Sequence, residues 1–278
     1  MLIDVHMHAF HPKIADKVLA QLKDHYAIAP VGTGMVDDLI ARLNRARLDS
    51  AVVLTAATTP AQVIPANNWS LSVGRDNPRL IPFGTIHPGF ESMEDELDRL
   101  ERSGIKGLKF HPDFQGYRLD DPALYDVMEM IGDRFVCLFH VGDTLPPEDN
   151  PSCPRKLAQL RKVFPAPVMI AAHMGGYRHW KYALEHLATT EVLVDSSSTL
   201  AFVDDAMLLR LYRAFGSRRI LFGSDYPLFD PGIEIERLQY RLNLSSGELD
   251  AILSNAGDIL IPHAVTARPK EHEQAKSC

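Results

Sequence analysis

Short runs of β-branched and other apolar residues recur along the chain at a spacing of about 30 residues. Eight of these runs have the length of a strand, and they begin at Leu2, Ala51, Leu80, Ile105, Phe135, Pro167, Val192 and Ile220. Segments with helical periodicity lie between the runs, among them residues 35–48, 92–104 and 204–216. In the last of these, Gly216 is expected to end the helix. The chain therefore alternates strands with helices.

Eight strands that alternate with helices predict an α/β protein of the (β/α)8 TIM-barrel type. The structural alternative is an open doubly wound sheet, but the glycine-rich turn expected after its first strand is missing. Residues 1–262 are expected to form one domain. Residues 9–34 are too long for an ordinary connection, so we expect an insertion over the barrel mouth, with a helix near Lys13–Asp24. Residues 263–278 are polar and are expected to be a disordered tail.

Composition places the chain among ordinary globular proteins and limits its partners. It has 278 residues, of which 46% are hydrophobic and 23% charged, with a net charge of -7. This charge argues against nucleic acid or an anionic membrane as the main partner. No apolar run approaches the roughly 20 residues of a membrane span. Three scattered cysteines suit a reducing compartment, so we expect a cytoplasmic protein without disulfides or a cysteine metal site.

The first strand carries two histidines two positions apart, in the sequence IDVHMHAF from Ile3. Alternation along a strand would place Asp4, His6 and His8 on one side and the apolar residues on the other. The pair alone leaves two interpretations open. It could provide two metal ligands, or one buried histidine and one loop histidine.

Further polar residues stand where other predicted strands end, and a barrel of this type carries its chemistry at these ends. With the first pair, they are His6, His8, Lys109, His111, His140, His173 and Asp225. A lone buried histidine is usually structural, but several imidazoles and a carboxylate that end different strands would face one small volume. Such ligands suit zinc, iron, manganese or cobalt better than calcium or magnesium. The sequence therefore predicts a metal site at the C-terminal ends of the strands.

Four segments also resemble a known family. These are DVHMH at Asp4, FHVGD at Phe139, AHMGG at Ala172 and LFGSDYP at Leu221. Together they resemble the amidohydrolase superfamily, in particular the amidohydrolase-related branch that includes aminocarboxymuconate-semialdehyde decarboxylase. The resemblance extends from about Leu2 to Ile261.

The resemblance implies a ligand set and a catalytic histidine. His6, His8, His140 and Asp225 would bind the metal, with one Zn²⁺ as the first candidate and two ions as the alternative. His173 matches a histidine that acts in catalysis or binds a second metal. A divalent metal lowers the pKa of a water molecule that it binds to about 7. Asp225 would then accept the proton of that water, and His173 would polarise the substrate carbonyl or help to stabilise the oxyanion.

Lys109 has three interpretations. It could be carbamylated and bridge two metals, bind a substrate carboxylate as a cation, or serve as a structural group inside the barrel. The mononuclear resemblance favours the substrate carboxylate. His111 could bind a second metal or the substrate, or it could be a loop residue without a metal role, and the last interpretation also applies to His87. Arg178, which follows His173 closely, is a candidate for binding a carboxylated substrate or a packing residue.

The leading functional hypothesis is a metal-dependent hydrolase that cleaves a C–N or C–O bond of a small, carboxylated molecule such as an amide or a lactone. The alternative is a metal-dependent, non-oxidative decarboxylase of a small aromatic or muconate-type acid. TatD-like deoxyribonucleases share the HxH motif, but they have a glutamate where this chain has Lys109. A non-catalytic barrel is disfavoured by the intact ligand set. A homodimer is a possible assembly.

Overall fold

A single barrel forms the centre of the molecule. The computed structural model describes residues 1–261. Its strands are β1 (Ile3–Met7), β2 (Ser50–Val53), β3 (Leu80–Pro82), β4 (Gly84–Thr85), β5 (Gly107–Phe110), β6 (Val136–Phe139), β7 (Met169–Ala171), β8 (Leu193–Asp195) and β9 (Ile220–Leu221). All paired neighbours are parallel, in the orders β1-β2-β3 and β4-β5-β6-β7-β8-β9.

Backbone hydrogen bonds complete the ring between these two sheets. β3 and β4 are two halves of one predicted strand, divided at Phe83, whose N–H donates to the Val53 carbonyl over 3.0 Å. At the other junction, Val5 N–H donates to Phe222 O and Asp225 N–H donates to His6 O, each over 2.8 Å. The eight predicted strands therefore close into a (β/α)8 barrel, and the predicted fold is confirmed.

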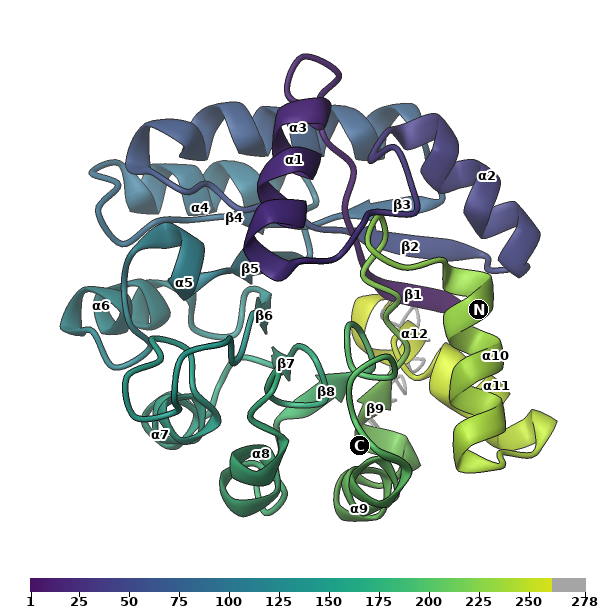
Figure 1. Ribbon diagram of the computed structural model, residues 1–278. Helices are drawn as coiled ribbons and strands as arrows, with labels where there is room; N and C mark the ends of the chain where they lie inside the picture. Colours follow the sequence, from purple (N-terminus) through teal and green to yellow (C-terminus); the bar gives the residue numbers. More distant parts are fainter. Residues whose placement is uncertain (262–278) are drawn as a thin grey trace, which may run out of the picture.

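The helices surround the strands (Figure 1). They are α2 (Val36–Ala46), α3 (Val63–Asp76), α4 (Met93–Arg102), the short α5 (Pro112–Gln115), α6 (Pro122–Ile131), α7 (Pro154–Val163), α8 (Trp180–His186), α9 (Asp205–Phe215), α10 (Pro231–Leu242), α11 (Ser246–Ser254) and α12 (Gly257–Leu260), with the 3-10 turns η1 (Pro60–Gln62) and η2 (Ser217–Arg219). The helix expected over residues 204–216 is α9, which is capped by Asp204 and followed by Gly216 at φ 69°. None of the helices within residues 1–261 has the length and apolar character needed to cross a bilayer.

Two apolar clusters pack on the strands. The larger lies between strands and surrounding helices and includes Leu43, Leu97 and Phe110. The smaller combines strand residues such as Leu138 and Leu221 with residues of α12. Met7 belongs to the larger cluster, whereas Ile3 and Val5 belong to the smaller one, so the simple alternation expected along β1 does not hold. The cause is an irregularity in the β1–β2 pairing between Asp4 and Met7.

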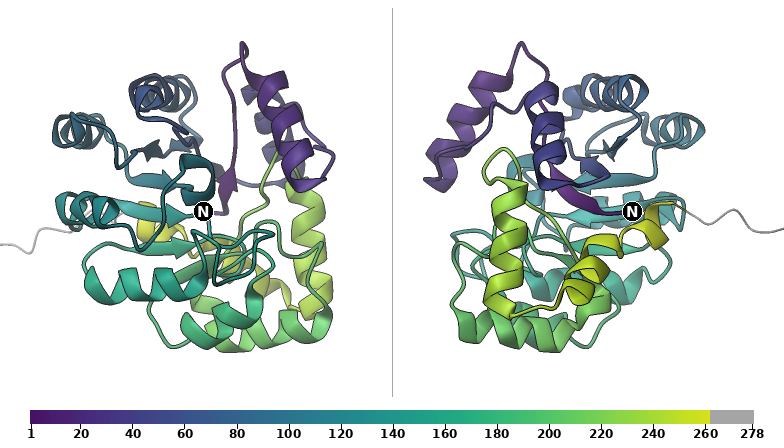
Figure 2. Two further views of the ribbon diagram at one scale, coloured as in Figure 1. Left: turned by 60° about the vertical axis from the view of Figure 1, so that its left-hand side comes forward. Right: turned by 90° about the vertical axis from the view of Figure 1, so that its right-hand side faces the viewer.

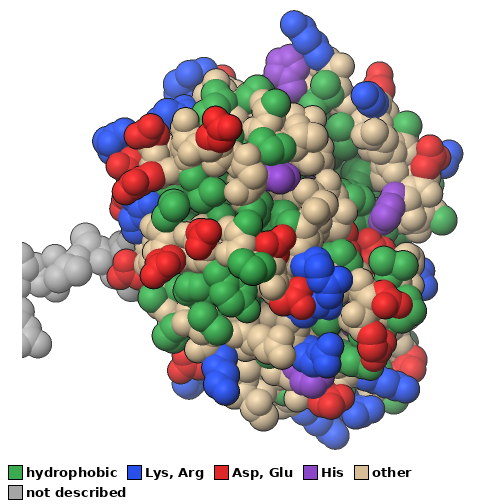
Figure 3. Space-filling model, turned by 90° about the vertical axis from the view of Figure 1, so that its left-hand side faces the viewer, with side chains coloured by type: hydrophobic (Ala, Val, Ile, Leu, Met, Phe, Trp, Pro, Cys, Tyr) green, Lys and Arg blue, Asp and Glu red, His purple; other side chains and the backbone are tan. Residues whose placement is uncertain are grey.

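Helix α1 (Ala15–Tyr26) belongs to the long segment expected as an insertion and lies outside the ring of helices, over the mouth of the barrel (Figures 1 and 2). Ala15 is its only buried residue among those described. On the side of the molecule at the left of Figure 1, acidic and basic side chains are interspersed (Figure 3). The expected disordered tail, residues 263–278, lies outside the described residues.

Candidate metal centre

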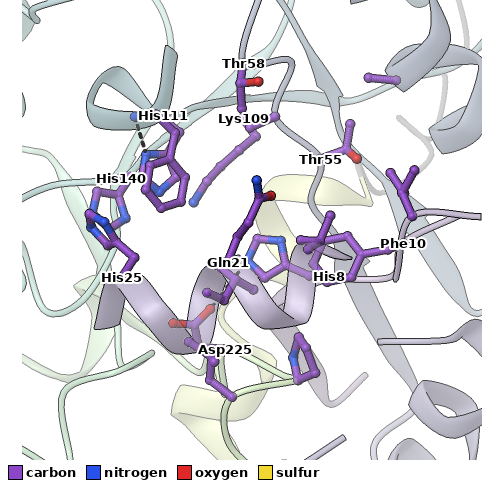
Figure 4. Close-up of a pocket in the computed structure, with 18 of the residues that line it drawn as sticks. His8, Phe10, Gln21, His25, Thr55, Thr58, Lys109, His111, His140 and Asp225 are labelled. Atoms are coloured by element: carbon purple, nitrogen blue, oxygen red, sulfur yellow. Dashed lines mark hydrogen bonds and ion pairs between the residues drawn. The ribbon is translucent and has the colours of Figure 1, made fainter. Parts of the chain in front are cut away.

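A cavity of about 900 Å³ opens where the strands end. Its floor is formed by side chains in the last residues of β1 and β5 or shortly after β1, β5, β6, β7 and β9, namely His6, His8, Lys109, His111, His140, His173 and Asp225. Lys109 and Asp225 point into the cavity from opposite sides (Figure 4). Of the predicted site residues, all except Arg178 therefore line one cavity.

Three of these residues form a compact group of ligand type. The Nε2 atoms of His6 and His8 lie 3.5 and 3.4 Å from Oδ1 of Asp225. All three ligand atoms lie within 4.8 Å of one another. Two ligand atoms bound at ~2.0–2.1 Å to a tetrahedral ion lie ~3.3–3.4 Å apart. The spacing of His6, His8 and Asp225 therefore fits a metal ion between them.

The opposite ring nitrogens of both histidines have acceptors. Nδ1 of His6 lies 2.9 Å from Oδ2 of Asp195, and Nδ1 of His8 lies 3.1 Å from the Leu54 carbonyl oxygen. A histidine that donates from Nδ1 keeps the lone pair on Nε2, which is the arrangement of a metal-binding histidine. Ser198 donates a hydrogen bond to Oδ2 of Asp225, which leaves Oδ1 toward the histidines.

Asp195 was not singled out from the sequence, although it ends β8 as the predicted ligands end other strands. It is fully buried, and its Oδ1 accepts hydrogen bonds from Ser197 N and His173 N over 3.0 and 3.1 Å. His6, His173 and Asp195 form a second group with potential ligand atoms within 4.8 Å. Asp195 contacts Nδ1 of His6 and thereby orients Nε2 of this ligand. We therefore interpret the second group as one that orients the ligands of the first group, and not as a second metal site.

His173 and His140 are neighbours beside the ligand group. Nε2 of His173 lies 3.0 Å from Nδ1 of His140, and Nε2 of His140 lies 2.8 Å from the Gly142 carbonyl oxygen. Both nitrogens of His140 therefore contact protein atoms, and His140 does not join the group formed by His6, His8 and Asp225. Its role as a ligand stays a prediction that requires its ring to turn.

His111 is stacked on His140, with ring centroids 3.9 Å apart. With Asp113 they form a third group of potential ligand atoms. Asp113, however, accepts hydrogen bonds from Asn150 Nδ2 and Ser152 Oγ over 2.9 and 2.6 Å. Through these contacts Asp113 anchors the loop after β6, which explains its presence without a metal ion.

Lys109 is a buried cation next to the ligand group. Its side chain is 1% exposed, and its Nζ lies 3.3 Å from Nε2 of His6. Within residues 1–261, no carboxylate lies close enough to Lys109 to form an ion pair at 4.0 Å. Burial lowers the pKa of Lys109 to about 8, although Asp195 and Asp225 favour its charged form. The ammonium group therefore predominates at neutral pH.

Burial and neighbouring charges also set the state of the ligands. Burial, with a further effect of Lys109, lowers the pKa of His6 to about 4. Burial alone would raise the pKa of Asp225, but the neighbouring imidazoles, His6 first and then His8 and His173, hold it well below its usual range. At neutral pH the site thus offers neutral imidazole and ionised carboxylate, which are the forms that bind metals.

Residues near the strand ends differ in whether they reach the cavity. Arg178 is exposed, has φ 60°, and its guanidinium carbon lies 5.2 Å from the centre of the Tyr177 ring. Tyr177 does line the cavity, and Trp180 donates to the His173 carbonyl oxygen over 3.1 Å. His87 contacts the Gln115 carbonyl oxygen over 2.9 Å and does not line the cavity.

A family model for Amidohydrolase matches residues 3–257, which is nearly the whole described chain. The chain belongs to the amidohydrolase family. No curated protein matches it by sequence. The expected membership of this superfamily and the expectation of an enzyme of this type are confirmed.

Solved structures with low sequence identity share the fold of this amidohydrolase. A TIM-barrel protein from Bordetella bronchiseptica is 15% identical, with 93% of this chain and 98% of that chain covered and a TM-score of 0.72. A 5-carboxyvanillate decarboxylase from Novosphingobium aromaticivorans, complexed with manganese and 4-hydroxy-3-methoxy-5-nitrobenzoic acid, is 16% identical, with 94% and 96% covered and a TM-score of 0.69. A proposed 2-pyrone-4,6-dicarboxylic acid hydrolase from Pseudomonas putida is 17% identical, with 93% and 97% covered and a TM-score of 0.65.

These relatives include both reaction types that the sequence left open. A decarboxylase and a proposed hydrolase both share the fold, so the choice between hydrolysis and decarboxylation stays a prediction. The decarboxylase contains manganese, and zinc in this amidohydrolase likewise stays a prediction. The same holds for the cytoplasmic location and the homodimer.

Proposed function

We propose that this amidohydrolase is a metal-dependent hydrolase that cleaves an amide, lactone or related C–N or C–O bond of a small carboxylated molecule with metal-activated water. The observation that carries the proposal is the convergence of His6 Nε2, His8 Nε2 and Asp225 Oδ1 in one group, in which His6 and Asp225 are buried and His8 is partly buried. Two imidazoles and a carboxylate leave open positions for water and substrate on a divalent ion.

His6, His8 and Asp225 would hold one divalent ion, with Zn²⁺ as the first candidate, and His140 would complete the set after a rotation of its ring. When bound, such an ion supplies Lewis-acid activation of water and of a substrate carbonyl. The other steps come from the protein. Asp225 is ionised, and its Oδ1 faces the ligand histidines, so it can take a proton from attacking water.

His173, in the form that is protonated on Nε2, would stabilise negative charge on the substrate oxygen from the side of β7. The Oγ of Ser197 lies 2.9 Å from its Nδ1, which fixes the ring so that Nε2 faces His140 and the cavity. Lys109 would bind the substrate carboxylate, because a buried ammonium without an ion-pair partner gains most from an anion placed beside it.

Decarboxylation is the second candidate, and Lys109 is the observation in its favour. The Nζ of Lys109 lies within 3.3 Å of a ligand histidine, so a carboxylate that it binds would stand next to the metal. A decarboxylation at that position would use the same three metal ligands, His6, His8 and Asp225. The matched 5-carboxyvanillate decarboxylase, crystallised with a nitrobenzoic acid, supports this alternative by analogy of fold.

The first test is the metal content per chain, measured by elemental mass spectrometry on protein purified without chelator. We expect one ion in the wild type, its loss in His6→Ala, and its retention in Lys109→Ala. Two ions that both depend on Lys109 would replace this proposal with a carbamate-bridged site. Absence of metal in every preparation would refute the metal-dependent function.

The reaction type is tested on lactones, amides and aromatic acids in H₂¹⁸O. A hydrolase incorporates ¹⁸O into the product, whereas a decarboxylase releases carbon dioxide without incorporation into the organic product. Release of carbon dioxide with no ¹⁸O incorporation would reject hydrolysis in favour of the second candidate. As a control, Asp113→Asn should give the same products and the same ¹⁸O content as the wild type. Asp113 anchors a loop and does not belong to the group of His6, His8 and Asp225.

A further inference from the structure

We infer that the substrate is an elongated, amphipathic carboxylate, with its polar head at the ligand group and an apolar aryl or alkyl body between α1 and α3. The inference rests on the proposed function for the position of the head, and it adds the class of the rest of the molecule. Its basis is the composition and extent of the cavity above the ligand group.

Apolar side chains from two helices line the outer part of the cavity. They are Ile14, Val18 and Leu22 from the α1 segment, and Pro65, Ala66 and Trp69 from α3. The floor, by contrast, is composed of histidines, Lys109 and Asp225. A ligand that matches both parts must have a polar end and an apolar end.

Within residues 1–261, the apolar face of α1 is only partly covered by other protein residues. Ile14, Val18 and Leu22 are spaced four residues apart, so they lie on one side of the helix. Ile14 is 49% exposed, and Val18 and Leu22 are only partly buried, whereas the sole buried residue of α1 is Ala15. An apolar ligand body would remove this face from water.

The opposite wall is held in place. Trp69 donates its indole N–H to the Ala9 carbonyl oxygen over 2.8 Å, and its ring contacts that of His11 at 5.1 Å. Since its polar atom is already satisfied, the indole offers the cavity an apolar surface. A planar or extended hydrocarbon can pack against it without leaving a buried donor unpaired.

Charge favours an anion for this cavity. Lys13 and Lys17 line its outer part, and Lys109 lies at its floor. Among the lining residues, all of which lie within the described part of the chain, Asp225 is the only carboxylate. Because Asp225 belongs to the ligand group, the field along the rest of the cavity attracts negative charge.

The size of the cavity argues against a substrate limited to one ring. Sites for drug-sized ligands range from roughly 300 to 1,000 Å³, and this cavity has about 900 Å³. A single-ring acid placed on the floor would leave the space between α1 and α3 filled with water. A substrate with an extended apolar body would fill the space between α1 and α3.

The test compares two probes, benzoate and biphenyl-4-carboxylate, by isothermal titration calorimetry on the full chain as purified. Both carry the same head, and only the second reaches beyond one ring. We expect biphenyl-4-carboxylate to bind at least tenfold more tightly. In Val18→Phe, which narrows the space between the helices, this advantage should fall at least tenfold, while the affinity for benzoate stays within about twofold.

A matched control is Ala20→Phe, which introduces the same side chain on the exposed side of the same helix, away from the cavity lining. It should change neither affinity. Equal affinity for the two probes, no binding of either, or an equal loss of both in Val18→Phe would overturn the inference.

Failure of the proposed function gives a different result. If the protein lacks metal and Lys109→Ala binds benzoate as the wild type does, the head site is refuted. The tenfold advantage of biphenyl-4-carboxylate and its loss in Val18→Phe would then still support the apolar part of the inference.

Discussion

Replacing Asp195 by asparagine should disable His6 as a metal ligand without a large change in shape. Oδ1 of Asp195 accepts hydrogen bonds from His173 N, Ser197 N and Ser197 Oγ. Because three donors face this position, the amide oxygen of the introduced asparagine must occupy it. The amide NH₂ then faces Nδ1 of His6, where Oδ2 of Asp195 lies at 2.9 Å in the wild type.

This exchange changes the tautomer of His6. An NH₂ group can only donate, so Nδ1 must become the acceptor and the proton moves to Nε2, which loses the lone pair needed for a metal. Loss of a partner that orients a ligand histidine typically costs 10–100-fold in metal affinity, or ~1.4–2.7 kcal/mol. Since the tautomer itself becomes wrong, we expect the upper end of this range or more for Asp195→Asn.

The assay is competition for Zn²⁺ and Mn²⁺ with a chromogenic chelator, together with thermal unfolding to check the fold. Ser196→Ala is the matched control, since Ser196 is the next residue after Asp195 but its Oγ forms hydrogen bonds with Gly223 and contacts neither Asp195 nor His6. It should change metal affinity by only a few fold. A variant Asp195→Asn that binds metal as tightly as the wild type would refute the assignment of His6 Nε2 as a ligand.

Three further predictions address the proton acceptor, a loop and a buried carboxyl group. Asp225→Asn should abolish turnover and keep the thermal unfolding temperature within a few degrees, because the amide cannot accept the proton of water. Gly142→Ala should destabilise the fold by ~2 kcal/mol or more in chemical denaturation, because Gly142 has φ 80° and an added Cβ would lie 2.4 Å from the Tyr177 carbonyl oxygen. Burial raises the pKa of Glu234 from 4.5 to about 7, so its protonated form stabilises the fold below pH 4.5 and this contribution is lost as the pH rises to about 7. The unfolding free energy of Glu234→Gln, measured against pH, should lack this fall, which amounts to at most ~3.4 kcal/mol.

Each of these three has a result that would contradict it. Near-wild-type turnover in Asp225→Asn would remove Asp225 from the mechanism. For Gly142, the control is Gly247→Ala in α11, where an added Cβ meets nothing within 4 Å and should stabilise slightly. Equal effects of the two alanines would contradict the steric argument, and parallel pH curves for Glu234→Gln and the wild type would contradict the role of Glu234.

The site residues at the strand ends were predictable because the apolar runs that carry them end in a histidine or an aspartate, and such polar residues are rare in a buried strand. His6, His8 and Asp225 follow this rule, and the structure brings them together. Asp195 follows it too, but a lone aspartate before three serines has the composition of an ordinary turn. Only the contact with His6, far away in sequence, shows what Asp195 does.

Other features depend on tertiary contacts that no local pattern encodes. The ring orientation of His140 follows from the Gly142 carbonyl oxygen and from His173. Arg178 has a positive φ in the turn after β7 and stacks on Tyr177 outside the cavity, although its place in the sequence suggested the pocket. A helix was expected within residues 9–34, but which of its faces covers the cavity depends on where it docks.

The junction between β1 and β9 has a consequence for how the protein is made. His6 and His8 leave the ribosome among the first residues of this sequence, whereas Asp225 follows only after β9. A nascent chain that stops before β9 has two histidines but neither the carboxylate nor the backbone bonds that close the ring. Metal capture by the proposed site would thus report that synthesis has passed Asp225 and that β9 has closed the ring, since a barrel without β9 lacks one of the three grouped ligands.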